Sequence, residues 1–289
     1  MLVRFLRFAI LGLLSALSTF ALAQTPASCT FTLFDFGGDQ GAQPTGINRW
    51  HNVVGNSAVG PFIRFSDGRI QKLPFTGFLG KRNAFGVTVG TFSTSDNHTH
   101  GFIQNGTQRT IVDFPGATHT ELRGINRYGT VVGNADASGG QFSVALKIKN
   151  GQTVVLPFGN NTTAAPQAIS DTGVIVGNHL VPEANNPGTL DEHGFAFANG
   201  QFVDFLFPGA TGTTANDINS SGMIVGDFGG GTSGGPGHYL FSGGKFFTVK
   251  LPGASGVLSG INGFGEITGF IFQNTAPLSR GFVGKCALP

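Results

Sequence analysis

The chain has 289 residues, of which 40% are apolar and 11% are charged, and the full sequence carries a net charge of +2. This apolar content is enough for a sizeable buried core, which excludes a disordered chain. The 47 glycines, 29 phenylalanines and 14 prolines favour short strands joined by tight turns over helices. We expect no nucleic-acid partner, because phosphate binding needs clustered positive charge and the chain has no run of lysine and arginine.

Residues 1–23 have the pattern of a secretory signal peptide. Arg4 and Arg7 precede an apolar run from Phe8 to Phe20, and Ala21-Leu22-Ala23 form a small-x-small cleavage site. An N-terminal membrane anchor is the alternative, but the run is shorter than the roughly 20 residues that a span needs. Cleavage would leave 15 basic and 15 acidic residues. We therefore expect a neutral mature protein that is secreted, extracellular or periplasmic, with no membrane insertion after cleavage.

Beyond a short tail at 24–28, the chain repeats one segment six times. The clearest copy is Gly124-Ile125-Asn126-Arg127-Tyr128-Gly129-Thr130-Val131-Val132-Gly133. Good matches lie at 46–55, 217–226 and 260–269, and weaker ones at 81–90 and 168–177. An asparagine lies seven residues before the closing glycine of each copy, with Ser170 in its place in the fourth. Asn126 and Gly129 suit the first and fourth positions of a type I turn.

A second pattern alternates with the first. It is clearest from His100-Gly101-Phe102 to Thr118, and it returns from His193 and from His238. Asn-Gly pairs at 105, 150 and 199 stand between apolar runs and predict tight hairpins. Each unit of about 43 residues therefore offers four short strands, the size of a propeller blade.

These two segments resemble the HAF family of extracellular repeat proteins, whose units pair a Gly-Ile-Asn-x-x-Gly-x-Val-Val-Gly segment with a His-Ala-Phe segment. The resemblance covers roughly residues 30–284. The second segment departs from the family pattern, because it reads His-Gly-Phe at 100 and 193 and degrades at 238 and 280. The resemblance implies a secreted repeat protein and brings no catalytic residues with it.

The two ends of the chain complement each other. The last unit stops at Pro289 without its fourth strand, and Thr30–Gly37 is such a strand without the rest of a unit. Counting along the repeat places Cys29 and Cys286 at neighbouring positions of one hairpin. We predict an all-β, six-bladed β-propeller over 29–286, closed by the N-terminal strand and a Cys29–Cys286 disulfide, with a C-terminal tail at 287–289. Two free thiols and a metal site are the weaker alternatives.

The histidines align with the repeat. His100, His193 and His238 are interpreted as one repeated position, which favours a structural role in which each satisfies the same backbone group. His98 and His100 share a strand face, but no third metal ligand is evident from the sequence. Asp35, Asp113 and Asp204 are expected to accept hydrogen bonds from turn amides.

We expect the binding site to lie in the connections that follow each closing glycine, because these connections vary in length while the rest of the repeat is constant. The longest is expected at 178–192. Candidate binding residues in or beside these connections are Asp96, His98, His100, Asp136, Glu183, Asp191, Glu192, His193, Asp227 and His238. Their carboxylates raise the hypothesis of a calcium ion, with no other cofactor expected.

No carboxylate pair, Ser/His/Asp set or Cys/His pair can be named from the sequence. The first hypothesis is therefore a monomeric, non-enzymatic binding or structural module that presents variable loops on one propeller face to a glycan or a cell-surface protein. The alternative is an extracellular polysaccharide hydrolase or lyase with a site at the central channel.

Overall fold

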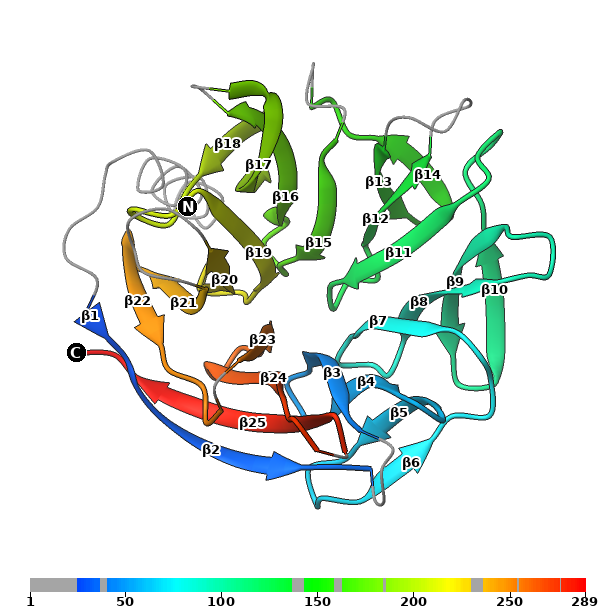
Figure 1. Ribbon diagram of the computed structural model, residues 1–289. Coiled ribbons are helices and arrows are strands. Elements are labelled where there is room, and N and C mark those ends of the chain that lie inside the picture. The colour runs from blue at the N-terminus through cyan, green and yellow to red at the C-terminus, as the bar shows by residue number, and fades with distance from the viewer. Residues whose placement is uncertain are drawn as a thin grey trace, which may run out of the picture.

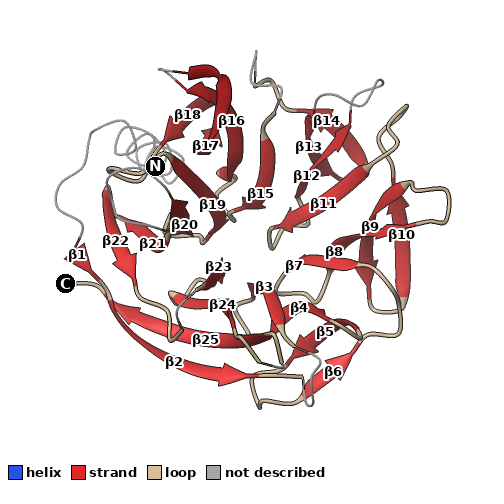
Figure 2. Ribbon diagram, in the orientation of Figure 1, coloured by secondary structure: helices blue, strands red, loops and turns tan. Residues whose placement is uncertain are grey.

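The computed structural model describes residues 25–36, 41–136, 143–158, 163–183, 186–229, 236–253, 255–275 and 277–289. These residues form six antiparallel sheets that radiate from a central axis, as Figure 1 shows. The predicted six-bladed β-propeller is thus confirmed, and every regular element of the described residues is a strand (Figure 2). The predicted signal peptide at 1–23 lies outside the described residues. In the described part of the chain, no helix is long and apolar enough to cross a membrane.

The first three blades each run from an innermost strand outward. Blade 1 comprises β3 (Gln43–Ile47), β4 (Val53–Ser57), β5 (Gly60–Arg64) and β6 (Ile70–Lys72). Blade 2 comprises β7 (Phe78–Arg82), β8 (Thr88–Ser93), β9 (Thr99–Asn105) and β10 (Gln108–Val112). Blade 3 comprises β11 (Thr120–Ile125), β12 (Val131–Asp136), β13 (Ser143–Lys149) and β14 (Gln152–Val155).

The last three blades follow the same order around the ring. Blade 4 comprises β15 (Ala165–Ile169), β16 (Ile175–Glu183), β17 (Asn186–Ala198) and β18 (Gln201–Phe205). Blade 5 comprises β19 (Gly212–Ile218), β20 (Ile224–Gly229), β21 (Gly237–Ser242) and β22 (Lys245–Val249), with β1 (Thr25–Pro26) added on its outer edge. Blade 6 comprises β23 (Gly256–Ile261), β24 (Glu266–Phe272), β25 (Ser279–Ala287) and, from the other end of the chain, β2 (Ser28–Phe34).

The ring closes as predicted. β2 pairs antiparallel with β25, and Cys29 lies directly opposite Cys286 with a sulfur–sulfur distance of 2.00 Å. β1, which the sequence does not predict, pairs in parallel with β22. The N-terminal segment therefore contacts two blades, and it joins the last blade to the one before it.

Each closing glycine is required by the packing of its own blade. Gly133 and Gly226 show this most clearly, because an added Cβ atom would lie 1.9 Å from a carbonyl oxygen of the innermost strand. A large buried side chain stands directly opposite each closing glycine on the third strand and covers it. These side chains are Phe62, Phe102, Leu146, Phe195, Tyr239 and Phe282. The glycine and its partner thus pack the interior of each blade and fix the register of its strands.

The asparagines of the repeat form a ring of turns on one face, which we call the turn face. The Oδ1 atom of Asn126 accepts hydrogen bonds from the backbone N–H groups of Tyr128 and Thr130, both at 3.0 Å. Its Nδ2 atom donates to the carbonyl oxygen of Ser170 in the next blade at 3.1 Å. Gly129 has a φ of +74°, which glycine adopts without strain. The predicted role of Asn126 and Gly129 as turn residues is confirmed.

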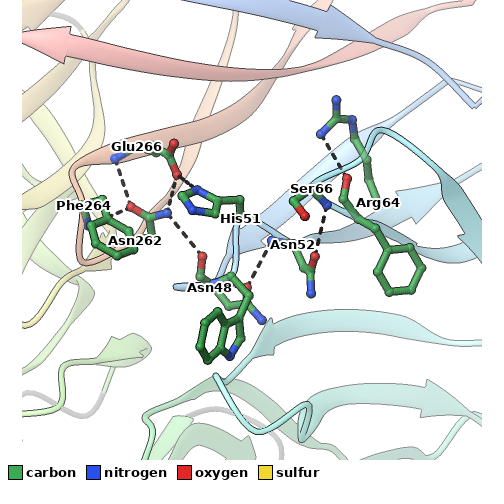
Figure 3. A network of polar contacts seen from close by, with 10 residues as sticks. Asn48, His51, Asn52, Arg64, Ser66, Asn262, Phe264 and Glu266 are labelled. Carbon is green, nitrogen blue, oxygen red and sulfur yellow. Dashed lines mark hydrogen bonds and ion pairs between the residues drawn. The ribbon is translucent and has the colours of Figure 1, made fainter.

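The same amide links recur around the ring. Five of them join consecutive blades, from Asn48 to Asn83, Asn83 to Asn126, Asn126 to Ser170, Asn219 to Asn262, and Asn262 to Asn48. Figure 3 shows the link from Asn262 to Asn48. Among the described residues no hydrogen bond joins Ser170 to Asn219, because serine has no amide group to donate. The ring is therefore open at one point.

Blade 1 departs from the repeat where the other turns have glycine. His51 occupies that position with a φ of +61°, an uncommon conformation for a side chain with a Cβ atom. Its Nδ1 atom lies 2.5 Å from the Oε2 atom of Glu266, and its ring stacks on Phe264 of blade 6 (Figure 3). These contacts across the blade 6 to blade 1 boundary hold the histidine in place.

Candidate functional site

The central channel is closed at mid-height by an ion pair between opposite blades. Lys81 on β7 and Asp217 on β19 occupy the position at which the other blades have a glycine or an alanine. Blades 2 and 5 lie three places apart in the ring (Figure 1), and the Nζ atom of Lys81 lies 3.0 Å from the Oδ2 atom of Asp217. Lys81 lines two cavities, one on the turn face and one on the opposite face, which we call the loop face.

Burial acts on both members of this pair. It lowers the pKa of Lys81 and raises the pKa of Asp217, because each loses hydration of its charged form. Backbone groups replace part of that hydration. The Nζ atom of Lys81 donates to the carbonyl oxygens of Thr45 at 2.7 Å and Ser259 at 2.6 Å, and Asp217 accepts from the N–H group of Ile261 at 3.0 Å. The pair is therefore fixed by the strands on both sides of it.

A β-bulge in the innermost strand of each blade supplies the wall of the loop-face cavity. The strand register shifts once in all six innermost strands. A bulge re-aims a side chain out of the regular alternation. The residues at the shifts all line one cavity of about 540 Å³, and they are Thr45, Gly80, Lys81, Arg123, Gln167, Asn216 and Ser259. In the sequence, these bulge residues lie at or just before the first residue of each repeated segment, where the residue type varies from copy to copy.

A chain of polar contacts stiffens the wall of this cavity in blades 3 and 4. Arg123 pairs with Glu121 and donates to the Oε1 atom of Gln167 at 3.1 Å. Gln167 in turn donates to the Oδ1 atom of Asn178 at 3.1 Å, and Asn178 donates to Glu192. Burial raises the pKa of Glu192. One candidate residue from the sequence, Glu192, is thus connected to the cavity.

Two more candidate residues meet in blade 5. The Nδ1 atom of His238 lies 2.6 Å from the Oδ1 atom of Asp227. The other carboxylate oxygen of Asp227 accepts a hydrogen bond from the Nδ2 atom of Asn216 at 2.7 Å. Asp227 therefore orients a cavity-lining amide, although neither Asp227 nor His238 lines the cavity.

The turn-face cavity is smaller and has a different rim. It has a volume of about 330 Å³, and arginines 49, 82 and 127 are among its lining residues. Exposed aromatic rings recur at one repeated turn position of this face in four consecutive blades, and one of them, Phe264, lines the cavity. They are exposed by 55–77%, and they are Phe264, Trp50, Phe85 and Tyr128. Both ends of the channel thus present surfaces that a ligand could contact.

The expected long loop at 178–192 is not a loop. β16 and β17 continue past the sheet edge as a paired hairpin, in which His179 lies opposite His193 and Val181 lies opposite Asp191. Asp191 and Glu192 are therefore strand residues. Glu183 ends β16, and its side chain lies outside the described residues. In the described residues, the variable segment of blade 4 is a paired β-ribbon, because backbone pairing continues where the composition predicts a loop.

The interpretation of His238 as an equivalent of His100 and His193 is wrong by one residue. Tyr239, not Leu240, lies opposite the closing glycine of blade 5, so His238 occupies the position of Gly101 and Gly194. A shift of one residue moves a strand side chain to the other face of its sheet. The three histidines therefore do not occupy one repeated position.

The predicted roles of His100, His193, Asp113 and Asp204 also need correction. His100 pairs with Asp113 at 3.0 Å and His193 pairs with Asp204 at 2.5 Å, so carboxylates rather than backbone groups are their partners. The imidazoles of His179 and His193 hold the pKa of Asp204 below its ordinary value. The predicted role of Asp35 stays a prediction. Its Oδ2 atom lies 3.4 Å from the Nε atom of Arg280, which occupies in blade 6 the position of His100 and His193.

The remaining candidates lie apart from the cavity. Asp96 and His98 are in the exposed β8–β9 turn, where the Oδ1 atom of Asp96 accepts a hydrogen bond from the N–H group of His98. Asp136 ends β12 and accepts a hydrogen bond from the N–H group of His119 at 2.7 Å. Asp96 and His98 thus belong to one connection, and Asp136 belongs to another in the next blade.

No protein-family model and no curated protein matches the chain. Among solved structures, TolB from Acinetobacter baumannii is similar with a TM-score of 0.51 and 12% identity, over 87% of this chain and 66% of the TolB chain. This chain thus spans just under two thirds of the length of TolB. A mutant of AofleA from Arthrobotrys oligospora has a TM-score of 0.43 and 9% identity, over 94% of this chain and 97% of that one. At such identity the similarity to TolB concerns the fold alone, and the score for AofleA carries no argument. The propeller fold suits a binding or scaffold module, and the disulfide is compatible with an extracellular or periplasmic location.

Proposed function

We propose that this protein is a secreted, non-enzymatic binding module of the HAF repeat type, and that it holds a neutral glycan in the loop-face cavity. The observation that carries this proposal is the set of six bulges that direct unlike side chains into one cavity on a fixed frame. Binding sites are commonly concave and preformed, with a few convergent polar groups among apolar ones.

The chemistry of the lining favours a hydroxyl-rich ligand. The hydroxyl groups of Thr45 and Ser259 donate to backbone carbonyl oxygens and can still accept a hydrogen bond from a ligand. Gln167 and Asn216 add amide groups to the lining. Phe78 is 53% exposed and lines the same cavity, where its ring offers a flat apolar surface for one face of a sugar. The two cations are compensated, since Lys81 pairs with Asp217 and Arg123 pairs with Glu121. The cavity therefore favours a neutral ligand over an ionic one.

The same lining favours binding over hydrolysis. Glycoside hydrolysis ordinarily uses two carboxyl groups placed on either side of the scissile bond. Among the described residues that line this cavity, Glu121 is the one carboxylate, and it is paired with Arg123. At this position the hydrolase alternative thus lacks the second carboxyl group that its chemistry ordinarily uses.

The test compares two phenylalanines of blade 2, Phe78 at the start of β7 and Phe85 in the turn between β7 and β8. The secreted protein is screened on a glycan array, and the affinity for the best glycan is measured by calorimetry for Phe78→Ala and Phe85→Ala. Phe85 is 77% exposed on the turn face, so it is the matched control. We expect Phe78→Ala to lose about 10-fold in affinity and Phe85→Ala to bind as the wild type does.

Three results would overturn the proposal. Loss of binding in Phe85→Ala alone would place the site on the turn face. Release of reducing sugar or of an unsaturated product from the bound glycan would establish the enzymatic alternative. Absence of glycan binding, together with saturable binding to a cell-surface protein, would identify the wrong class of ligand.

A further inference from the structure

Three potential metal ligands meet on one face of blade 4. His179 on β16 lies directly opposite His193 on β17, and Asp204 on β18 lies opposite Phe195, two residues after His193. Residues directly opposite each other, and residues two apart on one strand, share a sheet face. The ligand atoms of His179, His193 and Asp204 all lie within 4.8 Å of one another.

This cluster is distinct from the loop-face cavity. Asn178 and Glu192, which join the polar contacts of the cavity wall, alternate with His179 and His193 and so project from the other face of the sheet. The histidines share their face with Phe195 and Phe202, which pack against Phe158 from the blade 3 side. The cluster therefore lies between blades 3 and 4.

His179 supplies the observation that points to a ligand. The residue is 4% exposed, and neither of its ring nitrogens has a hydrogen-bond partner among the described residues. Its ring contacts Phe202 edge-on at 5.1 Å, and its Nε2 atom faces the Oδ2 atom of Asp204 at 3.6 Å. A buried polar group without a partner is costly, and such a group in a folded protein calls for an ion or water that completes it.

We propose that His179, His193 and Asp204 form a binding site for one divalent transition metal ion, for which Zn²⁺ is the expected occupant. Two imidazole nitrogens and one carboxylate oxygen are a donor set of zinc sites that keep a fourth position open. Asp204 is 47% exposed at its side chain, which leaves that position accessible to water. Calcium prefers oxygen ligands, so the donor set selects against it.

Both contacts of Asp204 can reach the spacing of a tetrahedral site. Metal–ligand distances of about 2.0–2.2 Å in a tetrahedral site place ligand atoms about 3.4 Å apart. The distance of 3.6 Å between His179 and Asp204 already fits. The contact of 2.5 Å between His193 and Asp204 has to open by about 1 Å, which a side-chain rotation of the half-exposed carboxylate provides.

Blade 2 provides an internal control. His100 occupies the position of His193 and also pairs with a carboxylate, but Phe92 occupies the position of His179. His179→Phe therefore copies into blade 4 a residue that the fold already accepts at the equivalent place. His100→Ala removes a histidine from the incomplete cluster.

The secreted protein is treated with a chelator, dialysed and titrated with Zn²⁺ in the presence of a chromophoric competitor. The number of metal ions bound per chain is measured by inductively coupled plasma mass spectrometry. We expect one zinc per chain in the wild type and in His100→Ala. We expect at least a 100-fold loss of affinity in His179→Phe and in Asp204→Asn, with metal-free melting temperatures near that of the wild type. Titration with Co²⁺ should give the absorption bands of a four-coordinate site in the wild type. His179→Phe and Asp204→Asn should not show these bands.

Absence of stoichiometric zinc in the wild type would overturn the proposal. So would zinc binding that survives in Asp204→Asn, or that disappears in His100→Ala. If His179→Phe does not fold, Asp204→Asn decides the matter, because it keeps the size of a half-exposed side chain and removes only its charge. None of these measurements uses a glycan, so failure here is separable from failure of the proposed function.

Discussion

Replacing Ser170 with asparagine should complete the ring of inter-blade hydrogen bonds and stabilise the protein. Ser170 holds its own turn with one side-chain contact to the backbone, in which its Oγ atom accepts from the N–H group of Val174 at 3.1 Å. The five asparagines at equivalent positions each donate an amide to the next blade. Ser170→Asn would supply the missing donor toward the carbonyl oxygen of Asn219.

The magnitude follows from the bonds that Asn126 makes. Asn126 has two contacts to backbone N–H groups and one to a carbonyl oxygen, two more than Ser170 has to the backbone. Two added hydrogen bonds contribute about 1–3 kcal/mol. Ordering the longer side chain, and losing the contact between the hydroxyls of Ser170 and Thr172, offset part of this gain. We expect a net gain of about 1 kcal/mol in the free energy of unfolding, or about 2–4 °C in Tm.

The assay is urea unfolding of three proteins that differ only at residue 170. The free energy of unfolding should rise from alanine to serine to asparagine, with equal dependence on urea concentration. Ser220→Asn makes the same chemical change at an exposed turn position outside the ring, and it should have an effect within about 0.5 kcal/mol. An asparagine variant no more stable than the wild type, or an alanine variant equal to it, would refute the role assigned to the ring.

Other consequences of the structure are directly measurable. Asn126→Ala removes three hydrogen bonds of a buried side chain and should lower the free energy of unfolding by about 2–3 kcal/mol, while glycan affinity in the folded fraction stays unchanged. A loss of affinity at unchanged stability would contradict this role. Cys29→Ser opens a long covalent loop and should lower the free energy of unfolding by about 5 kcal/mol. Hydrogen exchange in β25 should then be faster than in the strands of the other blades. Equal exchange in all blades would contradict closure of the ring between β2 and β25. Intact mass of secreted protein should show a start at Gln24 and no cysteine alkylated before reduction, and two alkylated cysteines would contradict the disulfide.

The architecture could be predicted because the repeat is carried by backbone requirements. A closing glycine recurs wherever a Cβ atom would strike the innermost strand, as at Gly133. The asparagine recurs wherever a turn needs both an acceptor and a donor to the next blade, as at Asn126. These constraints act at the same point of every blade, so they leave a period in the sequence. Ring closure then followed from counting residues to Cys29 and Cys286.

The candidate site could not be predicted in the same way, because local register decides it. His238 was aligned through its own residue type, whereas the large side chain opposite the closing glycine sets the register and places Tyr239 there. The segment 178–192 is rich in residues typical of loops, yet pairing from β16 and β17 carries His179 into a buried position opposite His193. The bulge residues occupy a variable position beside a repeated residue. Sequence variation at that position does not by itself indicate that the side chain faces a cavity.

The ion pair of Lys81 and Asp217 fills the axis of the ring and forms the floor of the loop-face cavity. At its level the strands from the other blades approach so closely that a Cβ atom on Gly260 would lie 3.0 Å from the Cα atom of Gly46. Small residues are therefore needed there, but six of them would leave the axis of the ring unfilled. Two long side chains from opposite blades fill it, at the desolvation cost that burial of two charges carries. Because four backbone contacts hold them, the loop-face cavity has a floor of fixed position. The ion pair thus sets the depth of the loop-face cavity, and the strands on both sides of the pair hold it in place.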